Sequence, residues 1–265
     1  MQIYVAEGGD RAQAEKLADR LGCPILYQSD QSGEPEAADG LLLCYDAQGL
    51  TLQGDGLSMQ GDFHHMIPRL KPGNLSREFL VKTSKLKNLG EHPIAIDATA
   101  GMGEDSLLLA AAGYTVYLYE LNPVIAALLQ DTVRRAADIP ELAPIVARMH
   151  VMPGDSIQAM KEDSRTDSIR YMEEVPDSKP DLILLDPMFP ARKKSGLIKK
   201  KFQLLQRLEQ PCSDERELME AAIQADPRRI LVKRPLKGPY LAGCKPDYSI
   251  QGKAIRYDCY NVRTR

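Results

Sequence analysis

A glycine-containing turn carries the residues with the clearest potential for chemistry, Asp97-Ala98-Thr99-Ala100-Gly101-Met102-Gly103. The turn follows a short apolar run and precedes a helical stretch, which is the context of a nucleotide-binding turn. Position 106, where a dinucleotide-binding turn has its third glycine, is Ser106. Glu104 and Asp105 begin the helix, and their charges would repel a pyrophosphate but attract an ammonium or sulfonium group. The turn therefore favours S-adenosylmethionine over NAD, with Asp97, Gly101 and Gly103 as cofactor-binding residues.

Further acidic residues follow the next two apolar runs. Glu120 stands 19 residues after Gly101, close to the spacing at which an acidic residue accepts hydrogen bonds from ribose hydroxyls. Asp155, followed by Ser156, could accept a hydrogen bond from an adenine amino group. Each acid taken singly could be a solvated loop residue. Ligands of open α/β sheets bind outside the carboxyl ends of the strands, so the series predicts a nucleoside site.

A fourth apolar run leads into Asp186-Pro187-Met188-Phe189-Pro190. An exocyclic amine of a nucleobase is a poor nucleophile, because its lone pair is conjugated with the ring. A carboxylate and a backbone carbonyl that accept its protons can steer the lone pair toward a methyl group, and an aromatic face can stack on a flipped-out base. We therefore predict catalytic roles for Asp186, Pro187 and Phe189. The alternative is a proline-rich turn in which Phe189 is a core residue.

The elements that must position these groups alternate along residues 91–265. Short apolar runs separated by helical stretches predict βαβ units and a Rossmann-like, mostly parallel sheet. The runs are Ile94–Asp97, Thr115–Glu120, His150–Met152, Asp181–Asp186 and Arg229–Lys233. A last run from Ile255 alternates apolar and polar residues, which suits an antiparallel edge strand. Residues 1–90 hold short apolar runs between Gly- and Asp-rich turns, which predict a small N-terminal α/β appendage.

Composition excludes several other classes of protein. The 265 residues include 34 Lys+Arg and 37 Asp+Glu, a net charge of −3, with 43% hydrophobic residues, as in an ordinary globular protein. We expect neither a membrane span nor a secretory signal, and therefore a cytoplasmic location. Five scattered cysteines without a C-x-x-C pair argue against a disulfide framework and a zinc site. The pair His64-His65 is a possible metal site, but a loop without a metal is the simpler interpretation.

Two basic stretches point to a polyanionic partner. Between Pro187 and Leu208 there is no acidic residue. The positive residues there are Arg192, Lys193, Lys194, Lys199, Lys200, Lys201 and Arg207. The second stretch contains Arg69, Lys71, Arg77, Lys82, Lys85 and Lys87, with Glu78 as its acidic residue. The alternative for either stretch is a solvated face. We predict RNA contacts at the first six residues of the first stretch and at Arg69, Lys71 and Arg77, and we expect neither DNA nor a membrane as partner.

From about Gly61 onward the chain resembles the RsmJ-like family of small-subunit ribosomal RNA (guanine-N2) methyltransferases. The motifs are Gly61-Asp62-Phe63, Arg69-Leu70-Lys71, the turn 97–103, residues 122–129, residues 185–190, Val232-Lys233-Arg234-Pro235 and Arg256-Tyr257-Asp258. The resemblance implies a seven-stranded sheet and metal-free transfer of methyl from S-adenosylmethionine to a guanine N2 amine in 16S ribosomal RNA. It also implies cofactor contacts at Glu104, Asp105, Glu120, Leu121, Asp155, Ser156 and Asp186.

The chain departs from this family in two places. Glu104 stands where an Arg is common, and a Gly-rich basic segment is reduced to Gly73-Asn74-Leu75-Ser76-Arg77-Glu78. The second departure affects how the appendage would touch RNA. Three alternatives stay open at this point: methylation of another base amine such as adenine N6, an NAD-dependent dehydrogenase on the same sheet, and an RNA-binding protein without catalysis.

Overall fold

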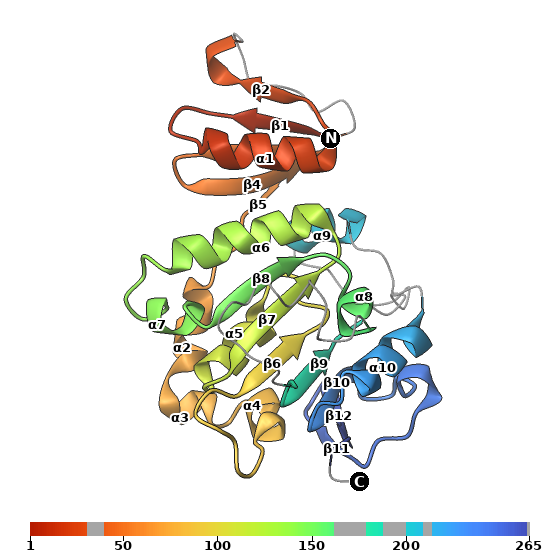
Figure 1. The fold of residues 1–265 in the computed structure, drawn as a ribbon. Helices are drawn as coiled ribbons and strands as arrows, with labels where there is room; N and C mark the ends of the chain where they lie inside the picture. The colour runs from red at the N-terminus through yellow and green to blue at the C-terminus, as the bar shows by residue number, and fades with distance from the viewer. Residues whose placement is uncertain (31–39, 162–178, 188–199, 209–213, 264–265) are drawn as a thin grey trace.

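The computed structural model describes residues 1–30, 40–161, 179–187, 200–208 and 214–263, which form two sheets (Figure 1). The smaller sheet has the strand order β2-β1-β3-β4-β5, and the larger has the order β11-β12-β10-β9-β6-β7-β8. Helix α6 (Pro123–Ala136) lies between the two sheets. None of the helices in these ranges is long and apolar enough to span a membrane.

The smaller sheet is built from the first 59 residues. Its strands are β1 (Gln2–Val5), β2 (Ile25–Tyr27), β3 (Leu42–Asp46), β4 (Gly49–Gly54) and β5 (Leu57–Met59). Strand β1 pairs in parallel with β2 and β3, whereas β3, β4 and β5 pair antiparallel. Helix α1 (Arg11–Leu21) begins at Asp10, whose side chain accepts a hydrogen bond from the Gln13 N–H, and ends at the left-handed Gly22. A mixed α/β unit is therefore present at the N-terminus, as the sequence predicts.

The larger sheet confirms the Rossmann-like, mostly parallel fold. Its strands are β6 (Ile94–Asp97), β7 (Thr115–Glu120), β8 (Met149–Pro153), β9 (Leu182–Leu185), β10 (Arg229–Pro235), β11 (Tyr248–Gln251) and β12 (Ile255–Asn261). Strands β6 to β10 are parallel, and β11 and β12 form an antiparallel pair at one side. The parallel strands read as continuous apolar runs because helices cover both faces of the sheet.

One detail of the predicted sheet is wrong: β12 is antiparallel, but it is not the edge strand. It lies between β10 and β11, and β11 forms the edge. The polar residues of β12 are buried rather than solvated, because Arg256 donates to the Asp258 carboxylate at 2.8 Å and Ser249 donates to it at 2.5 Å. Buried polar side chains that form hydrogen bonds with one another have the same alternating sequence pattern as a solvated face.

Helices cover both faces of the larger sheet. Besides α6, they are α2 (Ile67–Leu70), α3 (Pro72–Leu75), α4 (Phe79–Ser84), α5 (Glu104–Ala111), α7 (Ala143–Val146), α8 (Ser156–Lys161) and α10 (Glu215–Gln224). Helix α9 (Lys200–Leu208) lies against the smaller sheet and α6, and 3-10 turns occur at Gln28–Asp30, His64–Met66 and Leu241–Gly243. Alternate residues of β9 enter different cores: Leu182 and Leu184 pack with α4 and α5, while Ile183 and Leu185 pack with α8 and α10. This alternation fixes which strand residues face α5.

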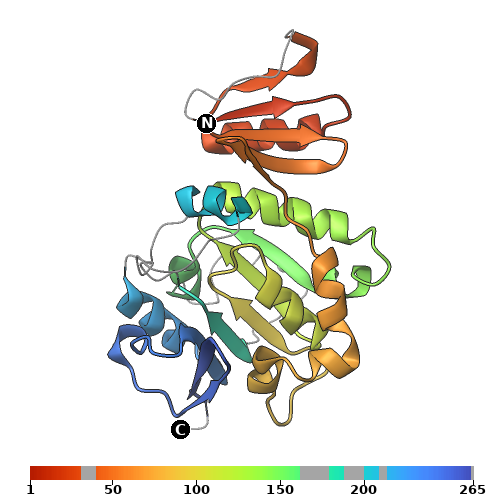
Figure 2. The same ribbon diagram turned by 180° about the vertical axis from the view of Figure 1, so that it is seen from behind.

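The point at which the chain passes from one hydrophobic core to the next does not coincide with the predicted domain boundary at residue 90. Phe63, Met66, Leu80 and Val81 are buried in the core of the larger sheet, so the helices after the smaller sheet belong with the larger one. Figure 2 shows the segment after β5 descending from the smaller sheet to these helices. The core changes near residue 60 because the apolar side chains before and after that point face different sheets.

The smaller sheet shares a core with α6 and α9. Leu43, Leu50 and Leu52 of the smaller sheet pack in one buried cluster with residues of both helices, among them Leu128, Leu204 and Leu205. The smaller sheet is therefore docked on the larger unit through a common apolar core. Helix α9, which begins 14 residues after Asp186 in the sequence, is part of this common core.

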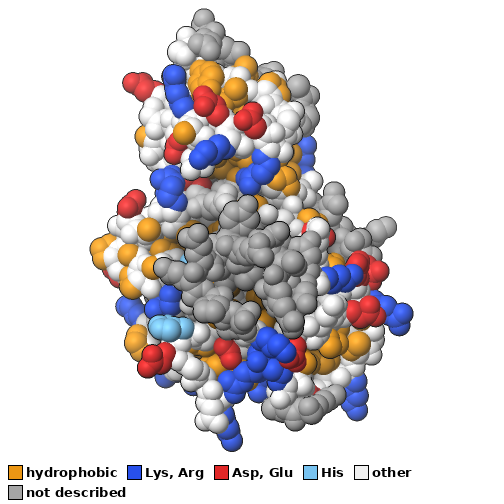
Figure 3. Space-filling model, in the orientation of Figure 1, with side chains coloured by type: hydrophobic (Ala, Val, Ile, Leu, Met, Phe, Trp, Pro, Cys, Tyr) orange, Lys and Arg blue, Asp and Glu red, His pale blue; other side chains and the backbone are white. Residues whose placement is uncertain are grey.

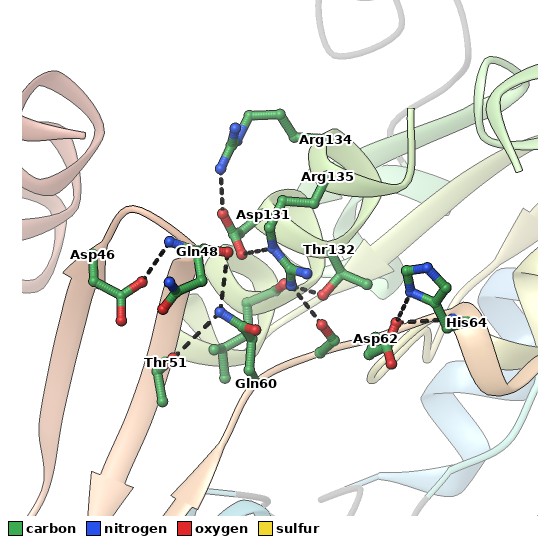
Figure 4. Close-up of polar contacts among 12 residues, drawn as sticks. Asp46, Gln48, Thr51, Gln60, Asp62, His64, Asp131, Thr132, Arg134 and Arg135 are labelled. Carbon is green, nitrogen blue, oxygen red and sulfur yellow. Dashed lines mark hydrogen bonds and ion pairs between the residues drawn. The ribbon is translucent and has the colours of Figure 1, made fainter. Parts of the chain in front are cut away.

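Polar contacts fix the connection between the two sheets (Figure 4). On α6, the largely buried Asp131 carboxylate contacts Arg134 at 2.8 Å and Arg135 at 2.7 Å. Arg135 also donates to the carbonyl of Gly61 at 2.5 Å, and Gln60 donates to the carbonyl of Gln48 at 3.3 Å. The connecting segment is thus held between α6 and β4.

We expect Gly61→Ala to lower the stability of the protein by about 1–3 kcal/mol, the usual cost of overpacking. A Cβ at this position would lie 1.9 Å from Thr132 Oγ1 and 2.8 Å from Met102 Cε. Gly73→Ala is the control, since a Cβ there has no atom within 4 Å. Equilibrium unfolding in urea measures both variants, and equal stability would contradict the close packing of the connection against α6.

Candidate functional site

The carboxyl ends of the parallel strands bring four of the predicted acids to one edge of the larger sheet. Asp97 ends β6 and Glu120 ends β7, while Asp155 and Asp186 follow β8 and β9. Neighbouring strands β9-β6-β7-β8 run in the same direction, so these residues lie in series along the edge where open α/β sheets bind ligands.

Glu120 ties the glycine turn to the end of β7. Its Oε2 accepts from the Gly101 N–H at 2.9 Å, and its Oε1 accepts from the Asn122 N–H at 2.8 Å. Burial raises the pKa of Glu120, while these backbone hydrogen bonds act in the opposite direction. Each carboxylate oxygen has a further lone pair, so a ligand hydroxyl can be accepted without breaking the turn.

The two glycines of the turn have different surroundings. Gly101 has φ +53°, and a Cβ there would meet no described atom within 4 Å. A ligand can therefore approach the backbone at Gly101. Gly103 has φ +78°, and a Cβ there would lie 2.6 Å from Leu129 Cδ1. Gly103 therefore allows α5 to pack closely against α6, whereas Gly101 leaves room for a bound group.

Asp97 is 2% exposed and is held by two residues, Ser106 and Thr99, to which the sequence assigned no role. Ser106 Oγ donates to its carboxylate at 2.5 Å and the Thr99 N–H donates to it at 3.2 Å. Burial raises the pKa of Asp97 to about 7, and the hydrogen bond from Ser106 opposes this shift. Ser106, which replaces the third glycine, thus anchors the buried acid.

Asp186 is connected to the same turn and to a lysine. Its N–H donates to Thr99 Oγ1 at 2.7 Å, which links the end of β9 to the turn after β6. Its Oδ2 lies 2.9 Å from Lys233 Nζ, and the same Nζ lies 2.6 Å from Asp105 Oδ2. Burial raises the pKa of Asp186 and the Lys233 ammonium lowers it. Pro187 follows as a buried residue.

Like Thr99 and Ser106, Lys233 is a site residue for which the sequence predicted no role, although it lies in one of the family-like motifs. Its position near the carboxyl end of the fifth parallel strand is the signal that could have found it. The residues Thr99 and Ser106 stand within the predicted turn and helix, but the side-chain contacts they make join segments that the sequence does not show to be neighbours.

The remaining predicted cofactor residues flank this edge. Leu121 is 67% exposed beside the partly buried Glu120 and offers an apolar contact surface. Asp155 is exposed, accepts from the Ile157 N–H at 2.8 Å, and precedes the buried Ser156 at the start of α8. Glu104 lies at the other side of the turn, where its Oε1 is 3.0 Å from His65 Nε2.

The histidine pair is paired with acids rather than gathered around a metal-binding group. His64 Nδ1 lies 2.9 Å from Asp62 Oδ1, and His65 contacts Glu104. Within the described ranges, no group of three His, Cys, Asp or Glu residues is placed to hold a metal ion. A small cavity of about 30 Å³ lies between this segment and the turn, lined by Gly61, Phe63, Met102 and others.

Several predicted RNA-binding residues lie in the described chain. Lys71 and Arg77 are exposed in the turns that separate α2, α3 and α4. Arg69 forms a two-point ion pair with Glu78, with N···O distances of 2.8 and 2.9 Å, so its charge is largely compensated. Lys200 and Lys201 begin α9. Phe189, Arg192, Lys193, Lys194 and Lys199 lie outside the described residues. On the face in Figure 3, Lys and Arg side chains lie at the junction between the unit of the smaller sheet and that of the larger sheet, and also on the unit of the larger sheet.

The residues at this edge of the sheet suit S-adenosylmethionine. A nucleoside needs acceptors for its ribose hydroxyls and an apolar contact for its ring, and Glu120 and Leu121 provide these next to each other. Ammonium and sulfonium groups need nearby negative charge, which the acids of the turn and of the first turn of α5 supply. Gly101, whose N–H donates to Glu120, leaves open space next to this acid, since a Cβ there would meet no described atom within 4 Å.

Comparison with known proteins identifies the family of the chain. The SAM_MT family, described as SAM-dependent methyltransferases, matches residues 34–262. A relative from Thioalkalivibrio sulfidiphilus named Ribosomal RNA small subunit methyltransferase J is 36% identical, with 98% of this chain and 97% of the relative covered. A relative of the same name from Pseudomonas fluorescens is 38% identical over 94% of this chain and 90% of its own length.

A solved structure shares the fold over the whole chain. It is described as a SAM-dependent methyltransferase from Neisseria gonorrhoeae, and it is 28% identical, covers 100% of this chain and 97% of its own, and superposes with a TM-score of 0.71. The sheet and its acidic edge thus define an S-adenosylmethionine-dependent methyltransferase of the Rossmann-like class. The predicted cofactor is confirmed, and the NAD-dependent dehydrogenase is excluded. Within this class, the chain belongs to the ribosomal RNA small subunit methyltransferase J family.

Proposed function

We propose that this enzyme transfers a methyl group from S-adenosylmethionine to the N2 amine of a guanine in 16S ribosomal RNA, in the cytoplasm. The relatives' name supports the small-subunit RNA, and the family resemblance of the Asp186 segment supports the guanine N2 amine. The observation that carries the proposal is the position of Asp186, which Thr99 ties to the cofactor turn at 2.7 Å. A target base held by Asp186 would therefore face the cofactor.

The chemistry divides between the cofactor and the chain. When bound, S-adenosylmethionine supplies a methyl group on a sulfonium with a neutral leaving group. Asp186 accepts a hydrogen bond from the guanine amine, and a backbone carbonyl at Pro187 accepts the second. As the amine nitrogen forms its bond to the methyl carbon, the carbon–sulfur bond breaks and positive charge develops on the amine, which then releases one proton to solvent. An anionic acceptor stabilises that charge more than it stabilises the ground state.

The other edge residues bind and orient the cofactor. Glu120 accepts from the ribose hydroxyls, Leu121 contacts the adenine ring, and Asp155 accepts from the adenine amine beside Ser156. Asp105 places its charge near the amino-acid end of the cofactor, on the first turn of α5. Phe189 supplies the stacking face for the base. Because hydrogen bonds and an ion pair already hold Glu120 and Asp105 in the described chain, little reorganisation of these two groups is needed during transfer.

The RNA contacts belong to the two basic stretches. Lys71 and Arg77 are exposed beside the larger sheet, and α9 begins with Lys200 and Lys201, 14 and 15 residues after Asp186 in the sequence. Phosphates near the target base would meet these charges. Ribosomal RNA or the small subunit is thus the proposed partner, with neither DNA nor a membrane.

Replacing Lys199, Lys200 and Lys201 together by Ala should flatten the salt dependence of RNA binding and leave cofactor affinity unchanged. Each lost phosphate contact lowers the log–log slope by roughly 0.7–0.9, because fewer condensed counterions are released. A triple change of Lys16, Lys161 and Lys179 to Ala alters net charge equally and is the control. RNA binding at several salt concentrations measures both slopes, and equal slopes would reduce the run to a solvated face.

The proposed substrate is tested by incubating the enzyme and labelled cofactor with 16S RNA, assembled small subunits, 23S RNA and transfer RNA. We expect label in 16S RNA, free or assembled. Label confined to 23S RNA or transfer RNA would overturn the proposed substrate.

A further inference from the structure

Lys233 lies between the acid of the cofactor helix and the acid of the target site. Its Nζ is 2.6 Å from Asp105 Oδ2 and 2.9 Å from Asp186 Oδ2, and the three side chains are only 24%, 20% and 37% exposed. At this degree of burial each contact is stronger than a surface ion pair, because water screens it less. The ammonium is therefore shared between two carboxylates with different tasks.

The sheet places Lys233 here for a local reason. Val232 pairs with Leu185 across β10 and β9, so the next residues along the two strands, Lys233 and Asp186, are neighbours. Leu231 packs in the core on the α5 side. Because strand residues two apart share a face, Lys233 points to the same side and meets Asp105 on α5.

The charges around Asp186 are unbalanced in favour of acids. Burial and the Asp105 carboxylate raise the pKa of Asp186, whereas Lys233 and Arg234 lower it. Asp105 and Asp186 in turn add to the burial that raises the pKa of Asp97. Asp105 and Asp186 raise the pKa of Lys233, and the buried Tyr257 also lies near it. Removing the lysine would leave two partly buried carboxylates facing each other next to the buried Asp97, which is an unfavourable arrangement.

We propose that Lys233 is a positioning residue for methyl transfer, holding the Asp186 carboxylate charged and aimed while its bond to Asp105 couples the target site to the cofactor helix. The inference rests on the proposed role of Asp186 as acceptor of the amine protons. Lys233 itself needs no contact with the substrate, since one ammonium bound at Oδ2 fixes the orientation of the whole carboxylate.

Opposite shifts in pH dependence follow from this arrangement. The reactive form of Asp186 is ionised, so the rate falls as pH drops through the pKa of Asp186. Lys233→Met removes the charge that lowers this pKa, so the acid limb moves to higher pH. Asp105→Asn removes an acid and leaves Lys233 to Asp186 alone, so the limb moves to lower pH. If Lys233 and Asp105 only supported the fold, their replacement would not shift the acid limb of the rate profile in opposite directions.

The test is single-turnover methyl transfer at saturating S-adenosylmethionine, from about pH 5 to about pH 8. We expect Lys233→Met to shift the acid midpoint upward by about one pH unit, which is tenfold in the protonation equilibrium. Lys233→Arg should restore most of the parent profile because the charge is kept. Lys179→Met, which breaks an ion pair with Asp226, should leave the profile unchanged. Thermal unfolding and binding of S-adenosylhomocysteine show whether each variant is folded.

Asp186→Asn distinguishes failure of this inference from failure of the proposed function. If Asp186→Asn removes the limb while Lys233→Met and Asp105→Asn leave it in place, the role of Lys233 is wrong and that of Asp186 stands. If Asp186→Asn keeps both the limb and the parent rate, the proposed function of Asp186 fails and the inference fails with it. If Lys233→Met does not fold, the Asp105→Asn variant tests the inference by itself. An acid limb at the parent pH in Asp105→Asn would overturn the coupling of Asp105 to Asp186 through Lys233.

Discussion

Asp186→Ala is expected to lower the single-turnover rate of methyl transfer by at least about a hundredfold at saturating S-adenosylmethionine, the scale for loss of one preorganised electrostatic partner. The amine gains positive charge only as it attacks, so the carboxylate stabilises the transition state more than the bound substrate. Saturating cofactor is needed because Asp186 lies at the cofactor edge and its loss could also weaken binding.

Asp138→Ala is the matched control for that experiment, since it removes an exposed carboxylate beyond the end of α6. Rapid-quench measurement of labelled methyl in RNA gives both rates. If Asp186→Ala transfers methyl at the parent rate, the end of β9 is a structural turn and the amine acceptor lies elsewhere.

Glu120→Ala is expected to weaken S-adenosylmethionine binding by about 1.5–3 kcal/mol, or roughly 10- to 150-fold. The variant loses the ribose acceptor and also releases the Gly101 and Asn122 N–H groups, which lie 2.9 and 2.8 Å from the carboxylate. The turn that faces the ligand would therefore lose its link to β7 as well.

Calorimetric titration with S-adenosylhomocysteine measures the effect of Glu120→Ala, and Glu141→Ala is a control at an exposed position. Glu120→Gln keeps one acceptor oxygen and should fall between the parent and Glu120→Ala. Unchanged affinity in Glu120→Ala would remove ribose binding from this residue.

Local patterns predicted the parallel part of the fold closely. The runs Ile94–Asp97 and Thr115–Glu120 coincide with β6 and β7, because apolar residues, glycine turns and helix caps act within a few residues of each other. The place of β12 in the sheet was not predictable in this way. Its polar residues Arg256 and Asp258 are paired with each other in the interior, and a pattern of polarity does not distinguish a buried ion pair from a solvated one.

The candidate site shows the same division. The acids at the strand ends follow from the order of strands and turns, whereas Lys233 required the three-dimensional contact with Asp105, 128 residues away in the chain. The Thr99 contact with Asp186 spans 87 residues. Contacts of this length depend on sheet register and on helix packing, which a single sequence does not specify.

Mass spectrometry of nucleosides from 16S RNA, after incubation with the enzyme and isotopically labelled S-adenosylmethionine, tests the central claim most directly. We expect labelled N2-methylguanosine with the parent enzyme and at least about a hundredfold slower formation with Asp186→Ala. Labelled N6-methyladenosine in place of N2-methylguanosine, or no labelled nucleoside from either free 16S RNA or small subunits, would contradict it.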